Sequence, residues 1–182
     1  VLLEQKEYDR VISINRSLVD TGLKDNTMLE RVLFDLGLAY ARKGDDKGAI
    51  PYFQRVMEEF PEGELAKIAT MELAYSYYYL GQYQEVLEVL NGIDSKEALE
   101  LKIDSASKIN DEEKLLSFYQ ELAEKYPEET TVVEGYFALA KSHYEKGEFQ
   151  EALNIFQKME NMTITEEIRK EINYWQGLSL FR

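Results

Sequence analysis

The sequence predicts an all-α fold in which pairs of antiparallel helices stack one upon another. Apolar and small residues recur three and four positions apart, the spacing that keeps side chains on one face of a helix. The 182-residue chain contains only three prolines and ten glycines, and both residue types weaken helix interiors. A set of small, aromatic and glycine residues also returns at fixed offsets along the chain, which indicates internal repeats.

The clearest copy of the repeat explains why each residue type recurs. Small residues at Gly37 and Ala49 let two antiparallel helices approach closely, and Phe53 packs beside that contact. Gly44 closes the first helix in a left-handed conformation, and prolines such as Pro61 and Pro127 end the second. The same offsets return twice in the later sequence, at Leu73, Ala74, Tyr77, Gly81, Val86 and Leu90, and at Leu139, Ala140, His143, Gly147, Ala152 and Phe156.

This pattern resembles the tetratricopeptide repeat (TPR). The resemblance implies a right-handed superhelix of antiparallel helix pairs, a non-catalytic role in protein–protein interaction, and a concave groove lined by the first helix of each pair. The matching positions are Leu33, Leu36, Gly37, Tyr40, Gly44, Ala49, Phe53 and Pro61 in one repeat, and Tyr136, Leu139, Ala140, Gly147, Phe149, Ala152 and Phe156 in another.

The repeat register predicts that residues 1–182 form one solenoid domain made of successive repeats. Most spacings between repeat starts exceed the family average of about 34 residues, which adds a helical turn after the proline, as at residues 62–65. Such lengthened repeats resemble those of bacterial cell-envelope assembly proteins, which favours the envelope or periplasm over the cytoplasm. The predicted parts are a partial repeat 1–29, repeats 30–66, 67–95, 96–132 and 133–169, and a half repeat 170–182.

Ten helices are expected from this register, and no strands. Residues 1–3 are expected to end a truncated helix that precedes them all, as if the chain were cut from a longer protein. Ser95 and Thr165 are predicted N-caps because acidic residues follow each in the first turn. The expected helices are 7–20, 27–43, 46–59, 63–80, 83–91, 95–109, 111–125, 130–146, 149–160 and 165–181.

The repeat that begins at Lys96 departs from the pattern. Ile103 stands where a small residue is expected, and Leu115 stands where alanine is expected. Asn110 replaces the glycine that ends the first helix. We therefore expect a wider contact between the two helices of this repeat, or a change of superhelix curvature there.

Composition narrows the classes of partner. The formal net charge of −14 disfavours nucleic acid and anionic membrane surfaces, and leaves a protein or peptide as the expected partner. The chain has no cysteine and shows no phosphate loop, dinucleotide motif or zinc motif, so neither a cofactor nor a metal is predicted. No apolar run approaches the roughly 20 residues of a membrane span.

The resemblance to TPR proteins implies specific groove residues at matching repeat positions. The lysine and asparagine with which heat-shock co-chaperones hold a peptide carboxylate are absent from these positions, so that activity is not expected. Tyrosine offers a large contact area at low entropic cost and keeps a hydroxyl group, which suits protein recognition. For the tyrosines, packing between repeats is the competing interpretation. The predicted groove residues are Phe34, Leu38, Arg42, Tyr75, Tyr78, Tyr79, Phe137, Lys141, Tyr144 and Tyr174.

Two residues at the tyrosine position of the repeat are assigned to packing. Tyr77 occupies an offset that faces the neighbouring helix, and His143, the only histidine, occupies the equivalent offset in a later repeat. A lone histidine cannot form a metal site or a nucleophile–histidine pair without partners, which the sequence does not locate. Catalysis is therefore not predicted.

Two further functions remain open beside a scaffold that binds a peptide or protein. The last helix has no following partner in the sequence, so Trp175, Leu178 and Phe181 are candidates for self-association, with a homodimer as the simplest product. The third hypothesis is an enzyme-associated role in which the catalytic domain lies outside this segment.

Overall fold

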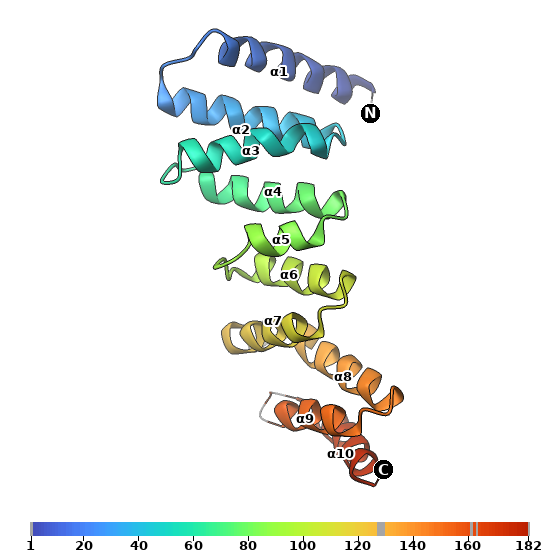
Figure 1. Ribbon diagram of the computed structural model, residues 1–182. Helices are drawn as coiled ribbons and strands as arrows, with labels where there is room; N and C mark the ends of the chain where they lie inside the picture. Colours follow the sequence, from blue (N-terminus) through green and yellow to red (C-terminus); the bar gives the residue numbers. More distant parts are fainter. Residues whose placement is uncertain (1, 127–129, 161, 163, 182) are drawn as a thin grey trace. The chain divides into compact units, whose positions relative to one another are not determined.

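The structure, a computed structural model, describes residues 2–126, 130–160, 162 and 164–181, and within these residues every regular element is a helix (Figure 1). The predicted all-α fold is confirmed. The helices are α1 (Leu2–Asp20), α2 (Asn26–Arg42), α3 (Asp46–Glu59), α4 (Ala66–Tyr79), α5 (Tyr83–Val89), α6 (Lys96–Lys108), α7 (Glu112–Lys125), α8 (Thr130–Glu145), α9 (Phe149–Met159) and α10 (Glu166–Leu180).

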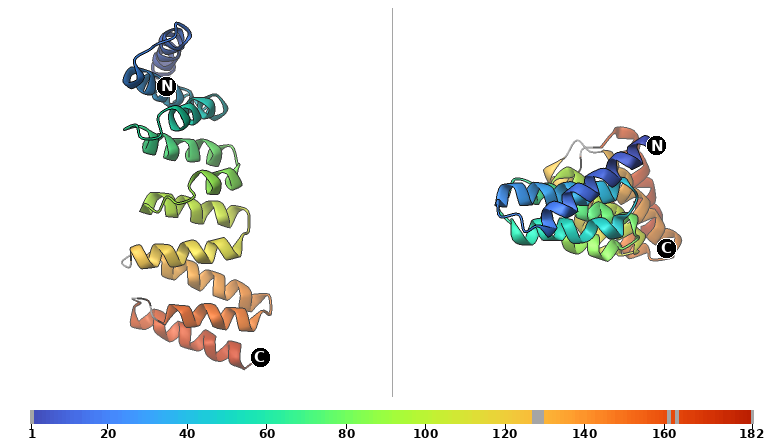
Figure 2. Two further views of the ribbon diagram at one scale, coloured as in Figure 1. Left: turned by 60° about the vertical axis from the view of Figure 1, so that its left-hand side comes forward. Right: turned by 90° about the horizontal axis from the view of Figure 1, so that it is seen from above.

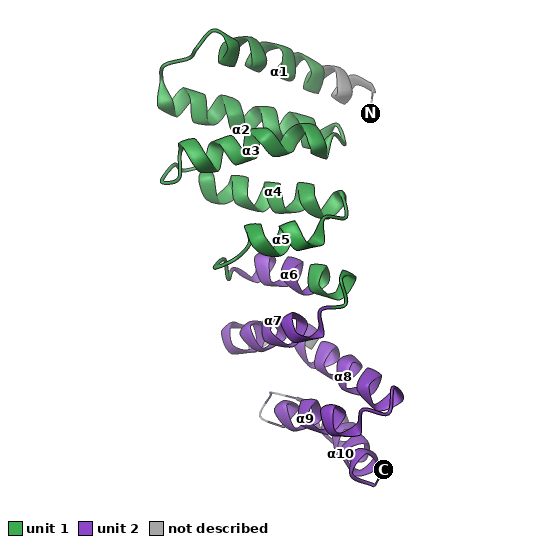
Figure 3. Ribbon diagram, in the orientation of Figure 1, with its two compact units in different colours: residues 1–94, 104–110 green, residues 95–103, 111–182 purple. Residues whose placement is uncertain are grey.

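The helices form two compact units. Unit 1 comprises residues 1–94 and 104–110, and unit 2 comprises residues 95–103 and 111–182, so α6 contributes to both (Figure 3). Within each unit, helices that follow one another in the chain pack side by side and are joined by short turns (Figures 1 and 2). This local stacking is what the repeat register predicts.

The core of unit 1 is built from the repeat positions that the sequence singles out. Leu33, Ala49, Phe53, Val56 and Leu73 are all at most 2% exposed, and they come from α2, α3 and α4. A β-carbon built on Gly37 would lie 2.5 Å from the ring of Phe53. Gly37 thus allows the close approach of α2 and α3 that its position in the repeat predicts.

Unit 2 buries the corresponding residues of its own repeat. Tyr136, Ala140, Ala152, Phe156 and Met159 are at most 1% exposed and join α8 to α9. Leu122 of α7 and Ile172 of α10 extend the same cluster. The core of each unit therefore runs along its stack of helices.

The turns inside the helix pairs use left-handed residues. Gly44, Gly81 and Gly147 follow α2, α4 and α8 with φ angles of 80°, 73° and 84°. Asn110 follows α6 with a φ of 55°, so the asparagine takes over the conformation of the glycine that it replaces. Asparagine is among the few other residues that adopt this region at low cost.

Side-chain caps define several helix starts. The predicted caps are confirmed: the Oγ of Ser95 accepts a hydrogen bond from the amide of Ala98 at 3.3 Å, and Thr165 accepts one from Ile168 at 3.3 Å. Three aspartates that the sequence analysis did not single out, Asp25, Asp45 and Asp111, cap α2, α3 and α7 in the same way.

Two predicted helix boundaries are wrong. Residues 2–20 form one helix, α1, whereas one helix ending at Leu3 and another beginning at residue 7 were expected. Val1 lies outside the described residues. Helix α4 begins at Ala66 and not at Gly63, because residues 61–65 form turns. Buried Glu30 accepts a hydrogen bond from the Leu65 amide at 2.9 Å, which holds this segment as a connection.

Other predicted boundaries agree within about two residues, the usual uncertainty of helix ends. Helix α3 ends at Glu59, two residues before Pro61, and α7 ends at Lys125. Pro127 itself lies outside the described residues. Over the described ranges, no helix has the length and apolar character needed to cross a bilayer.

Candidate protein-binding surfaces

In unit 1, the predicted groove residues come from two helices that pack against each other, α2 and α4. Arg42 on α2 forms an ion pair with Glu72 on α4, with 3.6 Å between Nη2 and Oε1. Leu38 is half-buried beside the core, and Arg42 is exposed. We call this the α2–α4 surface and define it by Leu38, Arg42, Tyr75, Tyr78 and Tyr79.

The three tyrosines of this surface cluster with a fourth, Tyr83, at the start of α5. The rings of Tyr75 and Tyr79 stack with centroids 6.4 Å apart. Tyr78 meets Tyr79 and Tyr83 edge to face, at 5.9 and 5.4 Å. Tyr79 is 70% exposed, so this tyrosine cluster (Tyr75, Tyr78, Tyr79 and Tyr83) presents aromatic area to solvent.

The hydroxyl of Tyr78 donates a hydrogen bond to a carboxylate oxygen of Asp104. This bond, with burial and the negative charge of Asp104 as further causes, raises the pKa of Tyr78 to about 12. The interaction fixes one ring of the cluster to the second half of α6, which also belongs to unit 1.

Phe34, also predicted to line the groove, is buried. It is only 6% exposed, and its ring centroid lies 5.9 Å from that of Phe53 in the core of unit 1. The side chain therefore stabilises the α2–α3 pair, and the α2–α4 surface does not include it. An aromatic residue at this position suits either the core or the groove, so the sequence alone does not distinguish the two.

Tyr77 packs as the sequence predicts. It is half-buried against the core of unit 1, and its hydroxyl accepts a hydrogen bond from the amide nitrogen of Gln54 at 3.0 Å. Burial raises its pKa. Tyr77 thus points towards α3, while Tyr79, two residues on, is exposed.

In unit 2, the predicted residues gather around Trp175 on α10. Tyr144 on α8 meets Trp175 edge to face at 5.2 Å, and the ammonium group of Lys141 lies 5.3 Å from the centre of the same indole ring. Phe137 is half-buried against Phe156, at 5.8 Å between ring centroids. These side chains pack α8, α9 and α10 together. Less of their surface is therefore available to a partner than the surface that the tyrosine cluster presents.

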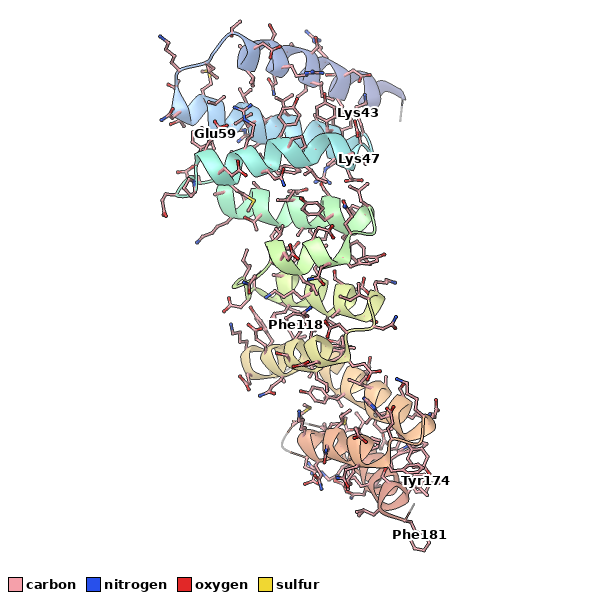
Figure 4. The ribbon with its side chains drawn as sticks, viewed as in Figure 1. Lys43, Lys47, Glu59, Phe118, Tyr174 and Phe181 are labelled. Carbon is pink, nitrogen blue, oxygen red and sulfur yellow. The ribbon has the colours of Figure 1, made fainter. Side chains whose placement is uncertain are left out.

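Two predicted residues on α10 are exposed, and the structure adds a third. Tyr174 is 62% exposed, although one side of its ring contacts Trp175 at 5.8 Å. Phe181 is 95% exposed and points away from the neighbouring helices (Figure 4). Leu180, which the sequence analysis did not single out, is 72% exposed, whereas Leu178 is half-buried.

His143 has two carboxylate partners that the sequence did not locate. Its Nδ1 lies 2.6 Å from Glu148 and its Nε2 lies 3.2 Å from Glu112, which also accepts a hydrogen bond from Lys146 at 2.7 Å. Lys146, and to a smaller extent His143, hold the pKa of Glu112 below its usual value. His143 itself is buried, and its partly exposed partners join α7 to α8 and to the start of α9, in keeping with the predicted packing role.

A metal centre is not formed by these acidic groups. Among the described residues, no three or more histidine, aspartate or glutamate side chains come together in an arrangement that could hold a metal ion.

Comparison with known proteins agrees with the repeat architecture. The family model described as intraflagellar transport protein 56 matches residues 33–175. A tetratricopeptide repeat protein from Parabacteroides merdae superposes with a TM-score of 0.54 at 20% sequence identity, over 81% of this chain and 60% of that one. This chain therefore spans less than two thirds of that protein.

Two structures of MamA are similar over a larger share of their length. MamA from Desulfovibrio magneticus RS-1 has a TM-score of 0.51 at 18% identity, and a MamA double mutant has 0.53 at 18%. In both cases the match covers 92% of this chain and 96% of the other. At these identities the likeness shows the fold, and it confirms the resemblance to tetratricopeptide repeats.

Proposed function

This chain belongs to the family of intraflagellar transport protein 56, and from that membership and its TPR-like fold we propose that it is a non-catalytic scaffold that binds a protein or peptide on the α2–α4 surface. Protein interaction is the general role of this fold. The observation that carries the choice of surface is the partly exposed tyrosine cluster on α4 and at the start of α5. Tyrosines of this kind dominate the binding energy of many protein interfaces.

The charge distribution supports this choice. In a chain with a net charge of −14, residues 73–84 contain no charged side chain, and they hold all four tyrosines of the cluster. Charged residues are depleted in the centre of protein interfaces, and tyrosine is enriched there. Arg42 beside the cluster is exposed and offers hydrogen-bond donors at its edge.

Site-specific photocrosslinking tests the proposal. A photoreactive phenylalanine derivative at position 79 should crosslink a partner protein in cells, whereas the same group at position 88, an exposed residue of α5, should not. A variant with Tyr75, Tyr78 and Tyr79 changed to Ala should bind that partner at least about tenfold more weakly. The loss of a single hot-spot tyrosine costs about 2 kcal/mol or more, and about 1.4 kcal/mol already corresponds to tenfold.

The matched control changes three exposed polar residues on the second helices, Glu58, Gln84 and Glu88, to Ala. Both triple variants should keep the helical circular dichroism of the parent chain. Equal crosslinking at positions 79 and 88, or full capture by the tyrosine variant, would place the binding surface elsewhere.

Self-association through α10 is the second candidate function, and the exposure of Tyr174 and Phe181 favours it. Light scattering should then give a mass above that of one chain, and removal of residues 165–182 should reduce it. Because Ile172 of α10 belongs to the core of unit 2, a second variant, Tyr174→Ala with Phe181→Ala, separates loss of the contact from loss of the fold. A monomeric parent chain at high concentration would exclude this candidate.

A further inference from the structure

His143 occupies a repeat position that in unit 1 links neighbouring helix pairs. Tyr40, Tyr77 and His143 are each the eleventh residue of their repeat in the sequence register. The hydroxyls of Tyr40 and Tyr77 accept hydrogen bonds from side chains on α1 and α3, at 3.4 and 3.0 Å. In unit 2 the Nε2 of His143 lies 3.2 Å from a carboxylate oxygen of Glu112 on α7. In all three cases the residue thus joins a first helix to the second helix of the preceding pair.

The two residue types at this position respond differently to pH. A tyrosine hydroxyl ordinarily keeps its proton across the pH range in which histidine titrates, whereas an imidazole ring gains or loses a charge there. The contact that His143 makes in unit 2 can therefore follow the pH. The equivalent tyrosine contacts of unit 1 lack such a group.

The ring of His143 lies between two carboxylates. Its Nδ1 is 2.6 Å from Glu148, which directly precedes α9, and its Nε2 faces Glu112. The side chain of His143 is only 11% exposed, so water has little access to either nitrogen. A neutral imidazole has one N–H and donates to one carboxylate, while its other nitrogen turns a lone pair towards the second. Only the doubly protonated ring donates to both carboxylates at once.

The charged groups that face His143 come from α7, from the end of α8 and from the start of α9. Glu112 belongs to α7, Lys146 directly follows α8, and Glu148 directly precedes α9. Lys146 lies 2.7 Å from the other carboxylate oxygen of Glu112. This ammonium group, and to a smaller extent His143, hold the pKa of Glu112 below its usual value, so the carboxylate stays ionised where histidine titrates.

The contact with Glu148 is better placed to keep the last proton of the ring. It is the shorter of the two, and the amide of Glu148 also donates a hydrogen bond to the carbonyl oxygen of His143 at 2.9 Å, which fixes the turn between them. When the ring becomes neutral, we expect its proton to stay on Nδ1. The lone pair of Nε2 then faces the charged carboxylate of Glu112, and the contact between α7 and α8 weakens.

We propose that His143 forms a proton-dependent contact between α7 and α8, which is complete when the ring carries both protons and weakens when Nε2 loses its proton. This regulatory feature of unit 2 goes beyond the proposed binding function and does not depend on it. The contact stabilises unit 2 while the ring is doubly protonated, and this stabilisation is lost as the pH rises through the titration of His143. The contact also weakens at acidic pH, where Glu112 becomes protonated.

The composition of the chain allows a direct measurement, because it contains one histidine and one tryptophan. In an isotopically labelled chain without a histidine tag, the NMR signals of the ring nitrogens belong to His143 and distinguish the imidazolium from each neutral tautomer. As the pH rises, we expect the imidazolium to give way to the tautomer that is protonated on Nδ1. In the same samples, the fluorescence of Trp175 reports the unfolding of unit 2 by urea.

As the ring becomes neutral, the unfolding constant of unit 2 should rise about tenfold relative to that of His143→Tyr, because a hydrogen bond between charged groups is lost. Tyrosine is the reference because it occupies the equivalent position in unit 1. Glu112→Gln should remove most of this pH dependence, since an amide group can donate to the neutral Nε2. Glu113→Gln is the matched control: it removes the same charge from an exposed position of α7 and should keep the pH dependence.

A constant ratio between the unfolding constants of the wild-type chain and His143→Tyr, while NMR shows the ring losing its proton, would overturn the proposal. A neutral ring protonated on Nε2 would also overturn it, because the contact with α7 would then persist. If His143→Tyr does not fold, Glu112→Gln and Glu113→Gln decide, and equal pH dependence of these two variants contradicts the proposal. None of these outcomes changes the crosslinking expected at position 79, so failure here is distinguishable from failure of the proposed function.

Discussion

The predicted groove residues of unit 1 and unit 2 occupy the same positions of the repeat, yet they make different contacts. In unit 1, Tyr75, Tyr78 and Tyr79 contact one another, and one ring is largely exposed. In unit 2, Lys141 and Tyr144 both contact Trp175 of the next first helix. The repeat position thus decides which side of a helix a residue occupies, and the residue opposite on the next helix decides how much of it remains exposed.

The largest effect should separate Phe34 from the exposed tyrosines. Phe34→Ala should lower the free energy of unfolding by about 3 to 4 kcal/mol, because it removes a buried ring beside Phe53 and leaves a cavity. Tyr79→Ala should change it by less than about 0.5 kcal/mol, as is usual for exposed positions. Urea denaturation followed by circular dichroism measures both, and similar values for the two variants would contradict the burial of Phe34.

A second comparison concerns α10. Trp175→Ala should destabilise unit 2 by about 2 kcal/mol, less than a fully buried ring, because Trp175 is half-buried between Tyr144 and Lys141. Tyr174→Ala, on the exposed side of the same helix, should cost less than about 0.5 kcal/mol and serves as the control. Hydrogen exchange of α8 and α10 localises the effect, and equal protection in the two variants would count against the packing role of Trp175.

Two glycines at the same repeat position should respond in opposite directions to alanine. Gly37→Ala should destabilise unit 1 by about 1 to 3 kcal/mol, because the added carbon meets the buried ring of Phe53. Gly177→Ala should stabilise the chain by about 0.5 to 1 kcal/mol, because open space surrounds it and alanine favours the helix. Thermal unfolding of both variants provides the measurement. A destabilised Gly177→Ala variant would mean that another group already covers this side of α10.

Much of this fold follows from sequence because the signals are local. Periodicity predicts the helices, and the left-handed turn at Asn110 follows from its place in the repeat. The start of α4 does not follow from the local sequence, because it depends on Glu30 of α2, which accepts a hydrogen bond from the Leu65 amide. Such a contact between distant residues leaves no pattern in the local sequence.

The candidate surfaces are less predictable than the helices for a similar reason. The register indicates which residues share a side of each first helix, but it gives no measure of how far the next helix covers them. Phe34 is buried and Tyr79 exposed for this reason. The carboxylates around His143 are another case, because Glu112 reaches it from the preceding helix.

The smallest expected effect concerns Tyr78 of the α2–α4 surface, whose hydroxyl donates a hydrogen bond to a carboxylate. The pKa of Tyr78 is raised to about 12 by Asp104, above the usual value of about 10. The hydrogen bond therefore stabilises the fold fully below about pH 10, and this stabilisation is lost as the pH rises from about 10 through 12. Asp104→Asn removes the negative charge and should return the pKa of Tyr78 towards 10.

Ultraviolet absorbance of the phenolate group measures this change. The titration curve of the Tyr78→Phe chain is subtracted from that of the chain that contains Tyr78, and the difference reports Tyr78. The comparison is made once with Asp104 and once with Asn in its place, so that the other tyrosines cancel. Identical difference titrations with Asp104 and with Asn would show that the carboxylate does not hold Tyr78, and the tyrosine cluster would then be as free to rearrange around a partner as its exposed member Tyr79.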